Sequence, residues 1–589
     1  MKRIQGILHM TTRNSKQQHY LKTILSTVSS SIFSILASAT PGLSANRIAF
    51  YYPPLGEFTI SADDIELFAK EGKITEDLAF YINRIPKAQR SQFRELLNTR
   101  FQVNATLVSQ FTYSQLGSKV VERLGTLLQT ESRAGNFFAL RSALILSAND
   151  PQGLNIVNVI RRYPSNTVRL NFSEIQGITN ELNSLLNKRD VVVAELKELT
   201  ATEARNQLNT KANIDFAQLQ DLRMPGGFSW RKQPIVMNDL FRKRVFAVDM
   251  YIPQTQIQRG EIGQKIKPPL PLIVISHGVA EDRETFAYTA QHLASYGFAV
   301  AVLEHPGSDA TKIQQYFSGL SSPPEAQELI NRPLDIKFLL DELQSNKKSY
   351  ASWKGLLNLS EVGIIGHSYG GYTSLALAGA NLDYTGIIKS CNPNKSLNLS
   401  VFLQCRANEL LQERVELPNL QDSRIKAVMA INPLNSVVLG KQGLSKIQIP
   451  VMLMGGSQDI ITPLVPEQVI PFTWLQTKNK YLATIENATH FSTAEKLDNS
   501  KGVLPVPPQL IGPDPAIAQT YVKSLSIAFF QTHLLKQQQY QPYLSATYSQ
   551  YISQAPLNLS FVQSLTAEEL QKMIDGESGK QDIRNLLIP

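Results

Sequence analysis

The chain has 589 residues, of which 43% are apolar and 18% charged, with 32 glycines and 31 prolines. These proportions are typical of a globular protein with more than one domain, and they exclude a disordered, a fibrous and a membrane-bundle protein. The formal charge of +9 does not indicate nucleic-acid binding, because five basic residues lie before residue 46 without an acidic one and no basic cluster interleaved with aromatics follows. We therefore expect no nucleic-acid partner.

The first 45 residues have the order of an export signal. The five basic residues precede an apolar stretch at 23–36, and small-residue cleavage sites follow at 37–39 and 43–45. A membrane anchor is the alternative, but a spanning helix needs about 20 predominantly apolar residues and this stretch is shorter and rich in serine. We predict that 1–45 is a cleaved signal peptide and that the protein is exported to the periplasm or the extracellular space, with the true start at Met1 or Met10.

Residues 46–215 have the periodicity of helices. Apolar residues recur at helical spacing at Phe93, Leu96, Leu97 and Phe101, and again between residues 175 and 186. Helix start signals occur at Ser61, at Thr75 and at Asp150, which Pro151 follows. The pattern predicts a small all-α domain, and it contains no motif that carries chemistry.

Residues 216–540 alternate short apolar runs with helical segments. Runs of four to six apolar residues are typical of strands that are buried on both faces of a parallel sheet. They lie at 272–276, 298–303, 362–365, 427–431, 451–454 and 481–485, and an antiparallel pair at 228–236 and 244–252 precedes them. A right-handed series of this kind predicts an open α/β sheet of the α/β-hydrolase type, with ligands bound beyond the carboxyl ends of the strands.

Two segments lie outside this series. An insertion at 381–424 contains both cysteines of the chain, Cys391 and Cys405, with an apolar cluster between residues 397 and 403. It leaves the sheet just after the helix that follows Ser368, so it either folds over the strand ends as a lid or forms a surface loop pinned by a disulfide. Export makes the disulfide plausible. Residues 541–589 are polar and poorly periodic, which predicts a C-terminal tail.

The segment GIIGHSYGGYT, residues 363–373, predicts a nucleophile elbow at Ser368. A strand signal precedes the serine and a helix signal follows it, so the serine falls on a strand-to-helix turn. At such a turn the backbones two residues to either side pass too close for a Cβ, and Gly366 and Gly370 meet that demand. The motif alone is weak evidence, but its context supports Ser368 as a nucleophile.

An active serine needs a histidine held by a carboxylate. Among the eight histidines, elimination leaves His490, which follows the final predicted strand in a loop that can bring its imidazole over the elbow. The others lie in the leader, beside the serine, within helices or ahead of the nucleophile: His9, His19, His367, His292, His533, His277 and His305. Asp459 follows the preceding strand. The order Ser368, Asp459, His490 is that of an α/β-hydrolase triad.

Acyl transfer also needs donors for the oxyanion. The backbone N–H of Tyr369, directly after the nucleophile, is one candidate. The other is the N–H of Val279, in the turn Ser276-His277-Gly278-Val279 after the strand 272–276. His277 is then a structural residue rather than a base. This machinery requires neither a cofactor nor a metal, and we expect none.

These motifs give the chain a family resemblance. Ser276-His277-Gly278, LASYGFAVAVLEHPG at 293–307 and GHSYGG at 366–371 resemble the platelet-activating-factor acetylhydrolase family and related bacterial lipases, over roughly residues 228–530. The whole arrangement of leader, helical domain and hydrolase resembles an uncharacterised group of exported cyanobacterial α/β hydrolases. The resemblance implies a metal-independent serine esterase with Ser368 and His490 as catalytic residues and Val279 and Tyr369 as oxyanion donors.

One departure from the acetylhydrolases concerns the acid. In that family the acid follows the earlier strand, where this sequence has Asn432, and an asparagine cannot hold an imidazolium as a carboxylate does. The acid has moved to Asp459, as in lipases and cutinase-like enzymes. This departure weakens the inference that the protein shares the specificity of the acetylhydrolases for acetyl groups on phospholipids.

The sequence supports one leading hypothesis and three alternatives. The leading one is an exported esterase that cleaves small-molecule or lipid esters, above all short-acyl or oxidised phospholipids, through an acyl-Ser368 intermediate. Whether the protein also contacts a membrane or lipid surface is left open by the sequence. Within enzymes the alternative is a cutinase-like polyester hydrolase. Outside enzymes it is an envelope-binding protein on a hydrolase scaffold. In a third alternative the N-terminal helices cover the active site.

Overall fold

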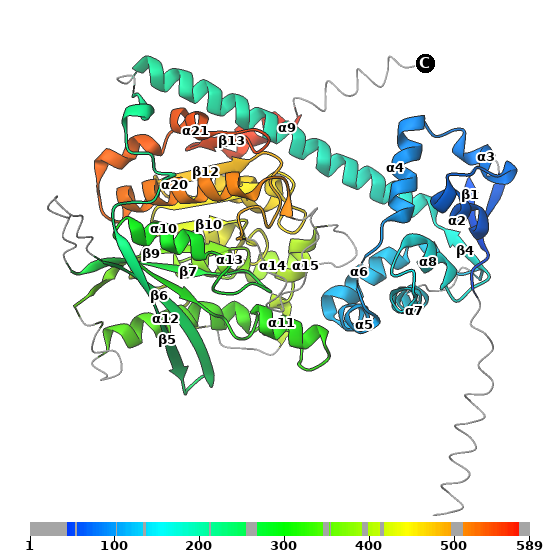
Figure 1. The fold of residues 1–589 in the computed structure, drawn as a ribbon, viewed down its shortest axis with the longest axis horizontal. Coiled ribbons are helices and arrows are strands. Elements are labelled where there is room, and N and C mark those ends of the chain that lie inside the picture. Colours follow the sequence, from blue (N-terminus) through cyan, green and yellow to red (C-terminus); the bar gives the residue numbers. More distant parts are fainter. Residues whose placement is uncertain are drawn as a thin grey trace, which may run out of the picture. The chain divides into compact units, whose positions relative to one another are not determined.

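The computed structural model describes residues 44–52, 56–101, 103–132, 137–210, 214–254, 268–345, 353, 355–391, 398–412, 418–495 and 511–575 (Figure 1). All but the last two residues of the predicted signal peptide, 1–45, lie outside this range. The chain divides into two units, Met1–Thr112 with Val120–Gln176, and Tyr113–Lys119 with Gly177–Pro589. The division falls inside the long helix α9 (Phe172–Thr210), whereas the sequence placed the boundary at residue 215.

The N-terminal region is largely helical, but it is not all-α as predicted. Its helices are α2 (Ala62–Glu71), α3 (Glu76–Ile82), α4 (Lys87–Asn98), α5 (Ala105–Tyr113), α6 (Gln115–Gly125), α7 (Phe137–Ala148) and α8 (Ile156–Arg161). A four-stranded sheet in the order β2-β1-β4-β3 accompanies them, with β1 (Arg47–Tyr52), β2 (Gly56–Ser61), β3 (Leu128–Gln129) and β4 (Thr167–Leu170). β1 and β2 are rich in aromatic and β-branched residues, which favour strands over helices.

Two of the three predicted helix starts are confirmed. The side chains of Ser61 and Thr75 cap α2 and α3 by accepting hydrogen bonds from backbone N–H groups of the first turn. The third is wrong, because Asp150 closes a turn instead: one carboxylate oxygen accepts the N–H of Gln152 and the other pairs with Arg162. The next helix, α8, begins only at Ile156.

The second unit contains a nine-stranded sheet in the order β13-β12-β11-β10-β9-β7-β8-β6-β5. Its strands are β5 (Ser229–Asp239), β6 (Arg244–Gln254), β7 (Leu270–Ser276), β8 (Ala299–Leu303), β9 (Leu357–His367), β10 (Ile425–Ile431), β11 (Val451–Gly456), β12 (Lys480–Ile485) and β13 (Leu559–Val562). Strands β7 to β12 are mutually parallel, and β5 and β6 form the predicted antiparallel pair. The predicted tail was wrong in part, since β13 extends the sheet antiparallel to β12. Residues 576–589 lie outside the described range.

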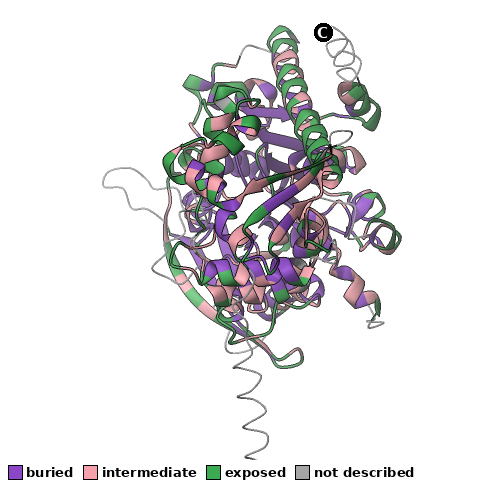
Figure 2. Cartoon of the chain, turned by 90° about the vertical axis from the view of Figure 1, so that its right-hand side faces the viewer, coloured by how far each residue is buried: buried purple, intermediate pink, exposed green. Residues whose placement is uncertain are grey.

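Helices cover both faces of this sheet (Figure 1). Alternate residues of each central strand point to opposite faces, so Leu272 and Val274 join one core cluster and Ile273 and Ile275 the other. The first cluster contains residues of α12 (Glu328–Gln344), α13 (Tyr369–Leu377), α17 (Gly440–Leu444) and α18 (Ile470–Trp474), and the second contains residues of α10 (Ala287–Ser295), α20 (Pro515–His533) and α21 (Ala546–Ile552). Figure 2 shows the strands as buried throughout much of their length. The predicted α/β-hydrolase fold is confirmed.

No helix in the described part of the chain combines the length and the apolarity that crossing a bilayer requires.

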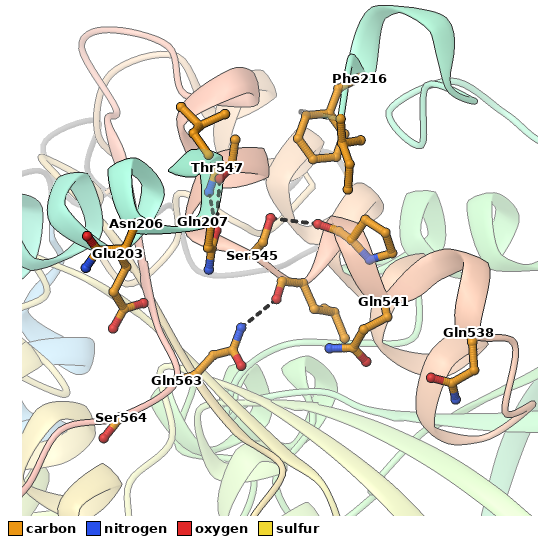
Figure 3. Close-up of a pocket in the computed structure, with 14 residues that line it drawn as sticks. Glu203, Asn206, Gln207, Phe216, Gln538, Gln541, Ser545, Thr547, Gln563 and Ser564 are labelled. Carbon is orange, nitrogen blue, oxygen red and sulfur yellow. Dashed lines mark hydrogen bonds between the residues drawn. The ribbon is translucent and has the colours of Figure 1, made fainter. Parts of the chain in front are cut away.

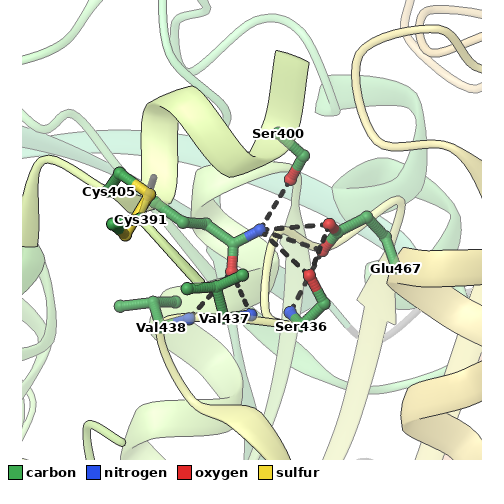
Figure 4. Close-up of a disulfide and its surroundings, with 8 residues drawn as sticks. Cys391, Ser400, Cys405, Ser436, Val437, Val438 and Glu467 are labelled. Atoms are coloured by element: carbon green, nitrogen blue, oxygen red, sulfur yellow. Dashed lines mark hydrogen bonds between the residues drawn. A yellow bond between two sulfur atoms is a disulfide. The ribbon is translucent and has the colours of Figure 1, made fainter. Parts of the chain in front are cut away.

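The insertion 381–424 contains three short helices and a disulfide. The helices are α14 (Tyr384–Ser390), α15 (Leu399–Gln404) and α16 (Ala407–Gln412), and the predicted bond between Cys391 and Cys405 is present (Figure 4). Residues 392–397 and 413–417 of the insertion lie outside the described residues.

The end of α15 is anchored by buried hydrogen bonds (Figure 4). Gln404 is fully buried; its Oε1 accepts the N–H groups of Val437 and Val438, and its Nε2 donates to the buried carboxylate of Glu467 at 3.1 Å. Glu467 also accepts the N–H and the hydroxyl of Ser436. Because breaking these bonds would leave several polar groups without partners, they favour a fixed α15 over a hinged lid.

We expect the disulfide to contribute measurably to stability. Replacing both Cys391 and Cys405 by Ala should lower the free energy of unfolding by about 3 kcal/mol, because the crosslink closes a loop with a sequence separation of 14 residues. Urea denaturation of the double variant measures the loss, and wild type under reducing conditions should match the variant. A loss below about 1 kcal/mol would show that the crosslink restrains little of the unfolded chain.

Candidate active site

Ser368 occupies the sharp turn between β9 and α13. Its backbone angles, φ 54° and ψ −114°, lie in a region that residues with a side chain rarely adopt. The turn is held on both sides, since the N–H of Ser368 donates to the carbonyl of Ile431 and its own carbonyl accepts the N–H of Tyr372. The strained serine of the predicted elbow is therefore present, with 6% of its surface exposed.

The two glycines that flank the turn are required by close backbone approaches. A Cβ on Gly366 would lie 2.0 Å from the carbonyl oxygen of Gly370, and a Cβ on Gly370 would lie 2.0 Å from that of Ser276. Both distances are far below any contact that a carbon atom tolerates. Gly366 and Gly370 thus allow the strand β7, the elbow and the start of α13 to pack against one another.

Asp459 and His490 are brought together as predicted. Asp459 follows β11 and His490 follows β12, and Asp459 Oδ2 lies 2.7 Å from His490 Nδ1. Because the carboxylate accepts, Nδ1 carries the proton and Nε2 keeps a free lone pair. Asp459 Oδ1 accepts the N–H groups of Ile461 and Thr462, each at 2.8 Å, which orients the carboxylate. Both Asp459 and His490 are buried.

Thr462 is a site residue that the sequence reasoning missed. Its hydroxyl lies 2.7 Å from Asp459 Oδ2 and 3.2 Å from His490 Nδ1. It therefore contacts the same carboxylate oxygen that faces the imidazole. Thr462 directly follows the Asx turn that Asp459 forms with the N–H of Ile461, and an aspartate followed three residues later by a threonine was the available signal.

The backbone of His490 is clamped against the elbow. Its carbonyl oxygen lies 3.0 Å from His367 Nε2 and 3.0 Å from Asn432 Nδ2, and the rings of His367 and His490 are 4.8 Å apart. The loop that carries His490 therefore packs against His367, the residue directly before the nucleophile. Within the described residues the Ser368 hydroxyl makes no hydrogen bond to the imidazole, and such bonds often tighten only when substrate binds.

His367 also forms a buried ion pair that sequence reasoning did not foresee. Its Nδ1 lies 2.7 Å from Glu281 Oε1, as an ion pair rather than an aligned hydrogen bond, and both residues are buried. Burial opposes the charge on His367, but Glu281 and the His490 carbonyl outweigh it and raise the pKa of the imidazole. Burial likewise opposes the charge on Glu281, yet His367 holds the pKa of that carboxyl below its ordinary value.

This pair predicts a pH-dependent contribution to stability. Because the folded-state pKa of His367 is raised, its contribution is complete below pH 6.5 and is lost as the pH rises through the folded pKa. The Glu281 contribution is complete above pH 4.5 and is lost as the pH falls through its lowered pKa. The difference in unfolding free energy between wild type and His367→Asn, from urea denaturation, should therefore shrink as the pH rises above 6.5.

His292 provides a matched control for this measurement. It is also a buried histidine, but burial lowers its pKa to about 4, so His292→Asn should give a difference that is independent of pH above 6.5. A constant difference for His367→Asn over the same range would contradict a charged His367.

The backbone N–H groups of both predicted oxyanion donors are uncommitted among the described residues. In the turn after β7, the N–H of Ala280 donates to the carbonyl of Ser308 and that of Gly278 to Glu281. Among the described residues, the N–H groups of Val279 and Tyr369 have no such acceptor. They are thus free for a ligand, which is the requirement for an oxyanion hole.

Asn432, at the position that carries the acid in the acetylhydrolases, forms hydrogen bonds here that connect the loop after β10 with the end of β11 and the loop after β12. It follows β10 in a left-handed conformation with φ 45°, its Oδ1 accepts the N–H of Gly456, and its Nδ2 donates to the His490 carbonyl. The carboxylate that contacts the imidazole is that of Asp459. That Asp459 acts as the catalytic acid stays a prediction.

A cavity of about 600 Å³ lies away from these residues (Figure 3). Its walls come from the end of α9, from Ile214 and Phe216, from residues 538–547 and from Gln563 and Ser564. Amide side chains dominate its polar lining. Neither Ser368 nor Asp459 nor His490 lines it, so this cavity is distinct from the candidate active site.

Comparisons with known proteins agree with the fold. A family model described as "Platelet-activating factor acetylhydrolase, isoform II" matches residues 235–348, a range that includes Val279 and ends before Ser368. A second model, described as "Alpha/beta hydrolase of unknown function (DUF1400)", matches residues 44–171. A comparison with curated proteins gave no match. The mostly parallel sheet is that of the α/β-hydrolase fold, and the two partial family matches support a hydrolase of the esterase type.

Proposed function

We propose that the protein is an exported serine esterase that hydrolyses carboxylic esters through an acyl-Ser368 intermediate. The observation that carries the proposal is the contact of Asp459 Oδ2 with His490 Nδ1, beside a serine held in the strained conformation of a nucleophile elbow. Short-acyl phospholipids and lipid-like esters are the proposed substrates, on the strength of the match to the acetylhydrolase model. The predicted leader supports export.

The residues suffice for a complete acyl transfer. Ser368 Oγ attacks the ester carbonyl carbon while its proton passes to His490 Nε2, and the oxyanion forms between the N–H groups of Val279 and Tyr369. Collapse breaks the ester C–O bond, and the leaving alcohol takes the proton from His490. A water molecule, deprotonated by His490, then attacks the acyl-enzyme and releases the carboxylic acid, which regenerates the Ser368 hydroxyl.

Activity-based labelling combined with an ester panel tests this proposal. A fluorophosphonate probe should label the folded protein at Ser368, as located by peptide mass spectrometry, and p-nitrophenyl esters of increasing acyl length should show a preference for short chains. Failure to label Ser368 in folded protein would reject the esterase and favour an envelope-binding role on a hydrolase scaffold.

A polyester hydrolase is the second candidate, and the position of the acid favours it. Asp459 follows β11, as in cutinase-like enzymes, whereas the position that follows β10 is Asn432. Side-by-side turnover of a short-acyl phospholipid and a polyester film separates the two candidates. Preferential release of soluble products from the film would replace the phospholipid proposal.

A further inference from the structure

We propose that Arg332 is a positioning residue that aligns both backbone donors of the oxyanion hole. This inference rests on the proposed function, because it assigns a role within the same site. The residue lies in α12, distant in sequence from the triad, and its guanidinium contacts the loop of one donor and the side chain of the other.

Arg332 is fully buried, and its guanidinium is directed at the turn after β7. Nη1 donates to the carbonyl of His277 at 2.5 Å, Nη2 donates to that of Gly278 at 3.0 Å, and Nε donates to the hydroxyl of Ser308 at 2.8 Å. A planar guanidinium presents its donors in a fixed fork, so two adjacent carbonyls bound to it are held in one relative orientation.

The bond to Gly278 determines where the next N–H points. In a trans peptide the C=O and the N–H of one peptide group point in opposite directions. Because the carbonyl of Gly278 faces Arg332, the N–H of Val279 in the same peptide faces away from the guanidinium. Donation to the carbonyl also polarises the peptide group, which makes this N–H a stronger donor.

The remaining polar groups of the turn are committed elsewhere. The N–H of Gly278 donates to Glu281, and the N–H of Ala280 donates to the carbonyl of Ser308 at 3.1 Å. Ala280 has φ 62°, a strained value that persists only where surrounding contacts impose it. The bonds around the turn thus leave the N–H of Val279 as the group available to a ligand.

Arg332 also contacts the second donor residue. Its guanidinium carbon lies 4.7 Å from the centre of the Tyr369 ring, a cation–π distance. One side chain therefore links the turn of Val279 to the first residue of α13, whose N–H is the other oxyanion donor. Arg332 therefore restrains the distance between the N–H groups of Val279 and Tyr369.

The neighbouring histidine does not compete for this role. His277 Nδ1 lies 2.7 Å from the carbonyl of Gly278, and its Nε2 accepts the N–H of His305, so one nitrogen donates and the other accepts. Burial and the nearby Arg332 charge lower the pKa of His277, in agreement with a neutral ring. Of the two side chains that bond to the Gly278 carbonyl, Arg332 is therefore the one that carries a positive charge.

The test measures catalysis and binding of a tetrahedral adduct in Arg332→Met and Arg332→Lys. For Arg332→Met we expect kcat on p-nitrophenyl butyrate to fall on the order of 10²-fold, as on loss of one oxyanion donor, with KM almost unchanged. The inhibition constant of a trifluoromethyl ketone, which forms an oxyanion on Ser368, should rise by the same factor. Arg332→Lys should retain part of the activity, because lysine keeps the charge without the fork.

Arg424 provides the matched control. It is an ion-paired arginine of the same unit that bonds to Asp422 and Asp341, and no contact joins it to the turn after β7 among the described residues. Arg424→Met should leave kcat and the inhibition constant near wild-type values. If Arg332→Met does not fold, as judged by near-UV circular dichroism, Ser308→Ala removes the Nε partner, together with the bond that its hydroxyl donates to Glu328. It leaves both carbonyl contacts of Arg332 in place and should lower kcat to a smaller degree without changing KM.

The outcomes separate the two proposals. Folded Arg332→Met and Ser308→Ala variants with wild-type kcat and inhibition constants would overturn the role of Arg332 and leave the esterase intact. A parallel change in KM and thermal stability, with the inhibition constant unchanged, would reduce Arg332 to a structural residue. Absence of fluorophosphonate labelling at Ser368 in wild type would reject the esterase itself.

Discussion

Replacing Ser368 by Ala is expected to lower kcat for ester hydrolysis by about 10⁶-fold, the scale seen when a triad nucleophile is removed. The reason is that the acyl-enzyme cannot form without the hydroxyl, while the oxyanion donors and the substrate contacts remain. Steady-state kinetics on p-nitrophenyl acetate and butyrate measure the loss. KM should change little, since the truncated side chain is small and the backbone of the elbow is held by its neighbours.

Ser526→Ala is the control for this substitution. Ser526 is a fully buried helical serine of α20, and among the described residues its hydroxyl bonds only within its own helix, to the carbonyl of Lys523. It should retain wild-type kcat and fluorophosphonate labelling. Full activity of Ser368→Ala would overturn the proposed mechanism, even though the chain has the α/β-hydrolase fold.

Asp459→Asn is expected to lower kcat by about 10⁴-fold, because the amide presents its NH₂ group to His490 Nδ1 and favours the wrong imidazole tautomer. The amide oxygen can still accept the N–H groups of Ile461 and Thr462, so the turn should keep its shape. The measurement is kcat over a pH series, together with thermal unfolding to show that the variant is folded.

Asn432→Asp tests the alternative place for the acid. Its side-chain nitrogen now donates to the His490 carbonyl at 3.0 Å, and a carboxylate there would face that carbonyl oxygen and lose the bond. We therefore expect Asn432→Asp to be less active than wild type and the double variant with Asp459→Asn to show no rescue. Recovery of activity in the double variant would place the functional acid after β10, as in the acetylhydrolases.

Much of the second unit could be predicted because its signals are local. Each buried parallel strand is a short run of apolar residues, and the segments of β7 to β12 were recognised from that pattern alone. The elbow was equally accessible, since Gly366, Ser368 and Gly370 fall between a strand and a helix in one stretch of sequence. The order of strands then suffices to place Asp459 and His490 at neighbouring strand ends.

The strands that were missed are short, and their pairing is not local. β4 and β13 have four residues each, and the β3–β4 pairing joins segments about 40 residues apart in the chain. Their formation depends on partners such as β1 and β12 that lie elsewhere in the sequence. Periodicity over a short window cannot detect such strands, although the aromatic and β-branched residues of β1 and β2 were a usable signal.

The candidate nucleophile, acid and base could thus be predicted from the sequence, because each of them follows a recognisable strand. The residues that position these side chains and the oxyanion donors could not be predicted in this way. Arg332 and Glu281 carry no motif, and no motif reveals the contacts of His367 and Thr462. These roles depend on hydrogen bonds and an ion pair between side chains and distant loops. Such bonds form only when burial brings the segments together and removes the competing water, so they are properties of the folded chain.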